Sequence, residues 1–446
     1  DDSTNNDIEY VAGNFGYANS LVNQGNQYKI IRGNLAVEAG YTGVGVRVGM
    51  IDSEHPNKAY YESNVVHVNS DITEIHEHPT TVADILFAMA PECTVYSYAV
   101  GEIRTNNVSE IKTFCNYIVE KIQYLIDTYN VDVVNMSYGV HNIVYSKFKD
   151  TVRTLDQMVT NSSTVICVAA GNTTEWYQEQ DNTFSNIFGQ VPNVITVGAV
   201  ATTGTDLSQP NAYKFENYSL YLQELKCISK PDICGPDLGT YPGYSEHGTS
   251  FATPYVTGTV IQMMSRNPWM PQQSLKAAII ASGTFKPQGF KSDIQNTIFS
   301  TKSGAGVVDA GFCFKVAGNG RRTEHTFTST GTWKTNVYAD YTTKPFRVAV
   351  TWNVSYDESG NQINPDIDIR LTKNGKRIAT STANSNIITN SAIPDLNYDG
   401  PCTNYEVIEV STDILKQYGA GTYELTIYHV GSYKGPVTVG AAWEQW

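Results

Sequence analysis

Short apolar runs that alternate with helical patterns constrain the fold of this chain most strongly. Residues 46–51, 131–136, 164–169 and 194–198 are apolar without a period-two alternation, which indicates strands buried on both faces of a sheet. Helical patterns lie between them, at residues 110–129 and 148–160. Because parallel strands are joined by crossover helices, this alternation predicts an α/β fold with a parallel sheet flanked by helices.

The pattern changes to period-two strands with turn signals after residues 318–320. The strand candidates are residues 346–354, 366–372, 405–410, 422–428 and 436–443. Asn374-Gly375 between two lysines indicates a tight hairpin turn. We therefore expect an α/β domain at residues 1–319 and a smaller all-β sandwich of jelly-roll type at residues 320–446. No low-complexity linker separates them, so the two should pack directly against each other.

Charge and hydropathy exclude several classes of partner. The net charge is −14, without a dense Lys/Arg patch, and this argues against binding to nucleic acid or anionic lipid. The longest apolar stretches fall well short of the roughly 20 residues that span a bilayer, so no membrane insertion is expected. The chain begins Asp1-Asp2-Ser3 without an apolar leader, from which we expect an export signal or pro-segment to have been removed or omitted.

Two candidate catalytic side chains stand at the ends of predicted elements. Asp52 follows the apolar run 46–51, at the strand end where an open α/β sheet gathers its active site, although a turn Asp is the simpler interpretation of this residue alone. His78 precedes a helical pattern with Pro79 in its first turn, which places His78 at the helix N-terminus. His76 and His55 are its rivals, and all three also fit surface loops.

A nucleophile and an oxyanion donor complete the set. Ser250 opens an apolar helix at residues 251–264, in which Pro254 is expected to lie within the first turn. A Ser there has a helix N-terminal N–H nearby, which suits a forming oxyanion. Asn172 closes the apolar strand 164–170 and offers a carboxamide N–H as a second donor. A simple N-cap and a Gly-Asn turn are the alternatives.

The segment Gly248-Thr249-Ser250-Phe251-Ala252-Thr253-Pro254 resembles the nucleophile motif of the subtilases, the subtilisin-like serine peptidases. Further segments resemble that family in the same chain order, at residues 46–53, 78–83, 134–139, 169–172 and 304–310. The order Asp, His, Ser is also that of the family. The resemblance covers about two thirds of the chain. The chain departs from the family pattern at Glu54, Pro79, Thr81 and Asp84, which makes it a divergent member with an altered cleft.

The resemblance implies a serine endopeptidase that acts on protein or peptide substrates and is secreted or at the cell surface. It implies that Asp52 orients His78, that His78 is the general base for Ser250, and that Asn172 and the Ser250 N–H bind the oxyanion. The residues implied to line the substrate cleft are Ser137, Tyr138, Gly139, Ala169, Ala170 and Gly171. The alternatives are a non-catalytic subtilase scaffold, and a protein- or glycan-binding sandwich that uses Trp333, Trp352, Tyr356 and Trp443.

No cofactor is required for this chemistry, and no metal is assigned to the catalytic site. Structural calcium is one interpretation of residues 357–361, which with Asp366 and Asp368 offer hard oxygen ligands. The spacing fits no EF-hand, and a solvated acidic loop is the simpler interpretation. The seven cysteines leave the redox compartment open. Cys227 and Cys234 are close enough in sequence to pair, while Cys115 and Cys167 resemble buried thiols.

Overall fold

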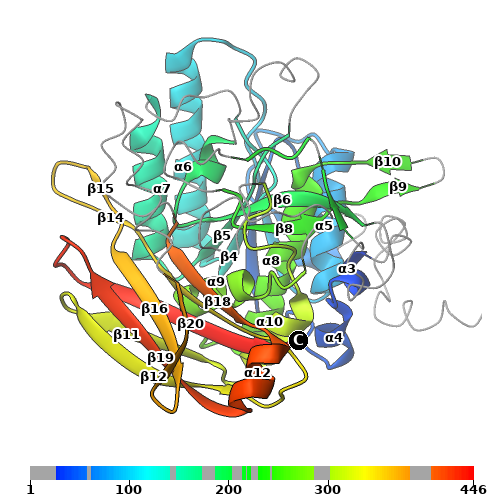
Figure 1. Ribbon diagram of the computed structural model, residues 1–446. Helices are drawn as coiled ribbons and strands as arrows, with labels where there is room; N and C mark the ends of the chain where they lie inside the picture. Colours follow the sequence, from blue (N-terminus) through cyan, green and yellow to red (C-terminus); the bar gives the residue numbers. More distant parts are fainter. Residues whose placement is uncertain are drawn as a thin grey trace, which may run out of the picture.

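The computed structural model describes residues 27–57, 62–140, 147–172, 186–202, 213–216, 218–221, 230–241, 244–285, 302–381 and 403–446. An eight-stranded sheet lies at the centre of the first part of the chain (Figure 1). Its strand order is β2-β3-β1-β4-β5-β6-β7, and β8 also pairs with β6. Among the described strands of this sheet, β7 alone runs antiparallel to its neighbour. Its strands are β1 (Arg47–Asp52), β2 (Val65–His67), β3 (Thr94–Ala99), β4 (Val133–Met136), β5 (Val165–Ala169), β6 (Ile195–Thr202), β7 (Tyr213–Phe215) and β8 (Ile233–Pro236).

Helices cover both faces of this sheet, as the sequence predicts. The helices of one face are α5 (Glu77–Met89), α8 (Thr249–Arg266), α9 (Gln272–Ala281) and α10 (Ala310–Asn319), and those of the other are α6 (Val108–Tyr129) and α7 (Lys149–Asn161). Successive strand residues point to opposite faces; Val133 packs with the first set and Val134 with the second. Shorter elements are α3 (Gln27–Ile30), α4 (Asn34–Glu38), the 3₁₀ turns η2 (Glu62–Asn64) and η5 (Ile187–Gln190), and the hairpin of β9 (Gly239–Tyr241) and β10 (Tyr244–Glu246).

The described residues after Gly320 form two four-stranded antiparallel sheets and a two-stranded sheet. The strand orders of the four-stranded sheets are β11-β20-β13-β18 and β12-β19-β16-β17, and a separate apolar core lies between these two sheets. The elements are β11 (Arg322–Phe327), β12 (Gly331–Ala339), β13 (Phe346–Trp352), β14 (Ser355–Tyr356), β15 (Gln362–Ile363), β16 (Asp366–Lys373), β17 (Lys376–Ser381), β18 (Tyr405–Val410), α12 (Thr412–Tyr418), β19 (Gly421–Val430) and β20 (Val437–Gln445). The predicted fold class, an α/β sheet followed by an all-β sandwich, is confirmed.

The hairpin turn and the aromatic core of the sandwich can be traced to particular residues. Asn374 and Gly375 both have positive φ angles, of 51° and 74°, as the predicted hairpin turn between β16 and β17 requires. Trp352 and Trp443 are buried in the core, so these two aromatic rings are not part of an exposed sugar-stacking face. Strands β11 and β12 are not among the predicted strands, because most of their side chains are partly or fully exposed and many are polar.

Helix α9 joins the two parts of the molecule. One continuous apolar core includes α9 and the strands of the parallel sheet, and it extends to Ala349, Tyr405 and Ala442 of the sandwich. The Nζ of Lys276 on α9 donates to the carbonyl of Pro192 at 2.9 Å and to Asn404 Oδ1 at 3.3 Å. The proposed division after residue 319 lies where α10 ends and Gly320 adopts a left-handed conformation; as a domain boundary it stays a prediction.

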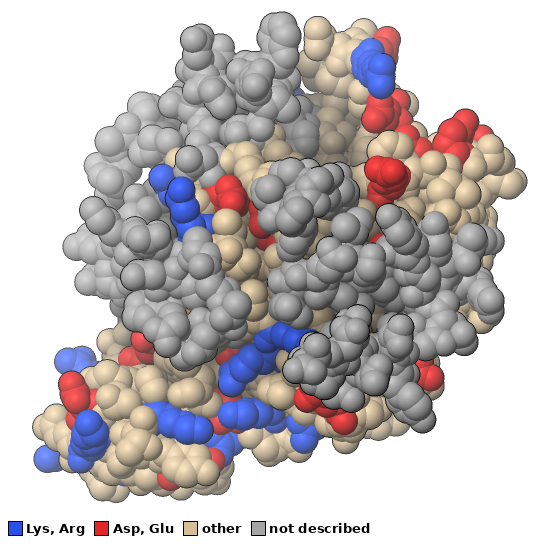
Figure 2. All heavy atoms as spheres, turned by 90° about the vertical axis from the view of Figure 1, so that its right-hand side faces the viewer, with Lys and Arg blue, Asp and Glu red and all other residues tan. Residues whose placement is uncertain are grey.

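Charge is distributed unevenly along the chain. Residues 1–319 contain 31 acidic and 19 basic residues and thus account for −12 of the net charge of −14. Figure 2 shows most Lys and Arg side chains of that face over the lower part of the molecule, where Figure 1 places the antiparallel sheets. Among the described helices, none has the length and apolar character needed to cross a membrane. Cys115, Cys167 and Cys234 are buried thiols, and Cys227 lies outside the described residues.

Asp156 of α7 makes stability depend on pH. It is fully buried, and it accepts hydrogen bonds from Asn193 N at 2.8 Å and Tyr356 Oη at 2.5 Å. Burial raises its pKa to about 7. Because the folded pKa exceeds the unfolded value of about 3.9, the contribution of this group is greatest below that value and declines as pH rises through about 7.

We compare the unfolding free energy of the wild type with that of Asp156→Asn. The wild-type value minus the variant value should fall by about 1–3 kcal/mol between pH 5 and pH 8. Urea unfolding of both proteins at the two pH values measures this difference. The same difference at both pH values would show that Asp156 does not titrate in this range.

Candidate active site

Asp52 and His78 are in hydrogen-bond contact at the carboxyl end of the sheet. Asp52 is the last residue of the central strand β1 and is 1% exposed. His78 lies in the first turn of α5, and its Nδ1 is 3.2 and 3.1 Å from the two carboxylate oxygens of Asp52. The Ser53 N–H donates to the same carboxylate at 2.8 Å. The carboxylate is therefore fixed, and it can fix the imidazole ring in turn.

The two rival histidines have other partners. His55 is buried, with Nδ1 2.9 Å from Ser97 Oγ and Nε2 3.1 Å from the Asn69 carbonyl. His76 caps helix α5, because its Nδ1 accepts the His78 N–H at 3.2 Å. Of the three candidates, His78 is the one in contact with Asp52.

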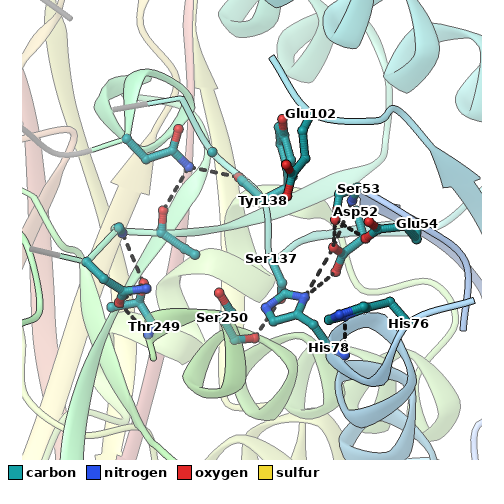
Figure 3. A pocket seen from close by; sticks show the side chains of 15 residues that line it. Asp52, Ser53, Glu54, His76, His78, Glu102, Ser137, Tyr138, Thr249 and Ser250 are labelled. Atoms are coloured by element: carbon teal, nitrogen blue, oxygen red, sulfur yellow. Dashed lines mark hydrogen bonds and ion pairs between the residues drawn. The ribbon is translucent and has the colours of Figure 1, made fainter. Parts of the chain in front are cut away.

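Ser250 is the second residue of α8 and faces His78. In Figure 3 its side chain and the His78 ring point toward one another. The His78 ring also packs against Phe251, with 5.4 Å between ring centroids. The structure thus brings Asp52, His78 and Ser250 together from three separate elements, β1, α5 and α8.

Pro254 departs from the sequence expectation. Helix α8 begins at Thr249, so Pro254 lies beyond the first turn rather than within it. Proline has no N–H to donate to the carbonyl four residues earlier, which here is that of Ser250. The Ser137 hydroxyl donates to that carbonyl instead, at 2.7 Å, and Asn135 Nδ2 donates to Ser137 Oγ at 2.9 Å. Ser137 therefore replaces a missing helix hydrogen bond directly at the candidate nucleophile.

Asn172 lies beside the N-terminus of α8. Its Oδ1 accepts hydrogen bonds from the N–H and the hydroxyl of Thr249, at 2.9 and 3.0 Å. Its Nδ2 faces Gly248, since a β-carbon built on that glycine would lie 3.5 Å from it. The carboxamide is therefore held by its oxygen, with its N–H₂ group next to the turn that carries Ser250.

A cleft of about 350 Å³ contains these side chains. Of the expected substrate-binding residues, Ala170 alone does not line it; Ala170 is buried behind the wall, and its carbonyl accepts the Asn186 N–H. The lining residues are Asp52, Ser53, Glu54, His76, His78, Glu102, Ser137, Tyr138, Gly139, Ala169, Gly171, Asn172, Asn186, Thr249 and Ser250. Burial first, and then Glu102, raise the pKa of the Tyr138 hydroxyl, so the phenol stays protonated.

Asn186 and Glu102 are lining residues that the sequence analysis missed. Asn186 Nδ2 donates to the carbonyls of Tyr138 and Ala169 at 3.0 and 3.1 Å, and so joins the two walls of the cleft. A β-carbon on Gly139 would come within 2.3 Å of the Asn186 side chain, which explains the glycine. An isolated Asn outside any recognisable motif gives no signal in the sequence.

In the part of the chain that the structure describes, one group of side chains could hold a metal ion. Ligand atoms of Glu216, Asp237 and His247 lie within 4.8 Å of one another. Among the residues considered for calcium, Asp357 accepts the N–H of Asn361 at 2.8 Å within a tight turn. Burial, and then Asp366, raise the pKa of Asp368 to about 6. A calcium site in this region stays a prediction.

Comparisons with known proteins agree on one family. The family model described as the subtilase family matches residues 26–312. Subtilisin amylosacchariticus of Bacillus subtilis subsp. amylosacchariticus is 26% identical over 275 residues, which cover 56% of this chain and 64% of that protein. Subtilisin of Bacillus pumilus is 25% identical over 277 residues, covering 56% of this chain and 88% of that protein. The alignment with the first relative thus spans slightly less than two thirds of its length.

Solved structures are similar at lower identity. MycP1 from Mycobacterium smegmatis is 17% identical, with a TM-score of 0.48 over 65% of this chain and 83% of that one. The serine protease of Aeromonas sobria is 15% identical, with a TM-score of 0.44 over 90% of this chain and 89% of that one.

Proposed function

The chain belongs to the subtilase family, and from this premise we propose that it is a serine endopeptidase that cleaves peptide bonds through an acyl-enzyme on Ser250. The observation that carries the proposal is the contact of His78 with the buried Asp52, on the side of the cleft that Ser250 faces. A serine hydroxyl needs such a base near neutral pH.

In the proposed reaction, His78 takes the proton of Ser250 as its oxygen attacks the scissile carbonyl. Asp52 holds the ring and stabilises the imidazolium that forms. The oxyanion is bound by the Ser250 N–H and Asn172 Nδ2. His78 then donates its proton to the leaving amine, and water hydrolyses the acyl-enzyme by the same route in reverse. This chemistry needs no cofactor, because side chains and a backbone N–H fill every role.

The walls of the cleft suit an extended peptide. Residues 137–139 follow β4 and residues 169–171 close β5, and both segments line the cleft apart from Ala170. Backbone groups at such strand ends can pair with a substrate as an added strand. We propose protein or peptide substrates, and on the same family grounds a secreted or cell-surface location and a pro-segment removed during maturation.

Covalent labelling tests the proposed function. A fluorophosphonate probe should modify Ser250 in the wild type, as peptide mass spectrometry would show, and should leave folded Ser250→Ala unmodified. Folded wild type that takes up no probe would refute the proposal and favour a non-catalytic scaffold.

Replacing Asn172 by Ala is expected to lower kcat by about 10²–10³-fold with little change in KM, the size of loss that removing this type of donor causes in subtilisin. The donor acts on charge that develops in the transition state, so ground-state binding should change little. Steady-state kinetics on a quenched peptide measures the effect, with the exposed Asn336→Ala as the control. A raised KM at unchanged kcat would indicate that Asn172 binds substrate instead.

A further inference from the structure

A second histidine–carboxylate pair lies next to the nucleophile turn, outside the cleft. We propose that Tyr218, Asp237 and His247 are positioning residues that hold the backbone before Ser250 in its reactive geometry. The inference rests on the proposed function. None of the three is among the residues that line the cleft, so they would act through Gly248 and Asn172 and not on the substrate.

Hydrogen bonds connect these residues to the turn. The Gly248 N–H donates to Tyr218 Oη at 3.1 Å, and Tyr218 Oη donates to Asp237 Oδ2 at 2.8 Å. His247 Nδ1 lies 3.0 Å from the same oxygen. His247 directly precedes Gly248, so two consecutive residues link the turn to the Asp237 carboxylate. The His247 side chain contacts the carboxylate directly, and the Gly248 N–H is connected to it through the Tyr218 hydroxyl.

Burial holds the Asp237 carboxylate and its hydrogen-bond donors in place. Asp237 is fully buried just after β8, where its N–H donates to the Val200 carbonyl at 3.0 Å. A buried carboxylate depends on its donors, which therefore keep their positions. The Tyr218 hydroxyl therefore donates to Asp237, and its oxygen accepts the Gly248 N–H.

Residues 218–220 also support Asn172, the other proposed oxyanion donor. Ser219 forms a β-bridge with Asn172, and the Leu220 N–H donates to the Gly171 carbonyl at 3.0 Å. Ser219 Oγ accepts the Ala199 N–H at 3.0 Å. Residues 218–220 are therefore hydrogen-bonded both to the end of β5 near Asn172 and to the turn that carries Ser250. Movement of this segment would change the distance between the two proposed oxyanion donors.

Tyr218→Phe removes the central hydroxyl and keeps the ring. We expect kcat, and the rate at which a fluorophosphonate probe labels Ser250, to fall about 10-fold while KM stays within twofold, because the defect lies in transition-state geometry. Tyr341→Phe makes the same chemical change at an exposed residue and should leave both rates unchanged. A Tyr218→Phe protein with wild-type kcat, or with a raised KM alone, would overturn the inference.

Variants of His247 provide a second test. The His247 side chain is half-exposed, so its replacement should leave the fold intact. His247→Gln retains an N–H that can donate to Asp237 and should keep kcat within threefold, whereas His247→Leu should lose about 10-fold. Equal kcat values for the two variants would overturn the inference even if Tyr218→Phe failed to fold. If wild-type Ser250 takes up no probe, the proposed function fails; if it is labelled and all variants match it, only the positioning role fails.

Discussion

Replacing His78 by Ala is expected to lower kcat for peptide hydrolysis by about 10⁶-fold, the loss that removing the general base causes in subtilisin. Without the imidazole, Ser250 has no group to accept its proton as it attacks. Residual hydrolysis, about 10³–10⁴-fold above the uncatalysed rate, should persist through the oxyanion donors and substrate binding. Active-site-titrated kinetics on a quenched peptide measures both quantities.

His76→Ala is the matched control for this experiment. His76 lines the same cleft two residues upstream, but its Nδ1 caps helix α5. Loss of the cap should cost about 1 kcal/mol of stability and leave kcat within a few-fold of the wild type. If His76→Ala were inactive and His78→Ala active, the assignment of the general base would be wrong.

Replacing Lys230 by Met is expected to lower the free energy of unfolding by about 3–5 kcal/mol. Lys230 and Asp232 are 2% and 1% exposed, and Lys230 Nζ lies 2.7 Å from Asp232 Oδ2 and 3.0 Å from the Val194 carbonyl. Met keeps most of the side-chain volume but removes the ammonium group that donates to the buried Asp232 carboxylate. Removing one member of a buried pair is costly for this reason, whatever the net value of the intact pair.

Lys334→Met provides the comparison. Its ion pair with Glu424 on the sandwich has a similar Nζ–oxygen distance of 2.8 Å, but the two side chains are 58% and 40% exposed. Such a pair contributes at most about 1 kcal/mol. Urea unfolding of both variants measures the contrast. Equal losses would mean that burial does not determine the cost at Lys230.

The sequence was sufficient to predict the elements that carry the proposed catalytic residues. A polar residue close to the end of an apolar strand, such as Asp52 or Asn172, is a local signal. In the structure Asp52 is the last residue of β1, Asn172 follows the end of β5 by three residues, and both line the cleft. The helical pattern alone left His55 and His76 as rivals of His78, and the resemblance of residues 78–83 to the family's His segment selected His78. In the structure, tertiary contacts bury His55 and direct His78 toward Asp52.

The contacts of Asn186, Tyr218 and Pro254 could not be predicted from the sequence either, because they too are made between distant parts of the chain. The hydrogen bonds of Asn186 to Tyr138 and Ala169, and those of Tyr218 to Asp237 and Gly248, join residues 17 or more positions apart, and no local pattern encodes such pairing. The expectation for Pro254 was wrong because a hydroxyl from Ser137, 113 residues earlier in the chain, satisfies the carbonyl that the proline leaves without its usual donor.

The continuous core around α9 means that the sandwich and the parallel-sheet body should lose their structure together. Ala349, Tyr405 and Ala442 pack into the same core as α9, so a chain that stopped before the sandwich would expose an apolar helix face to water. Such a face favours self-association. The sandwich is therefore expected to act as an obligatory folding partner of the parallel-sheet body, and a truncated chain to accumulate as insoluble aggregate.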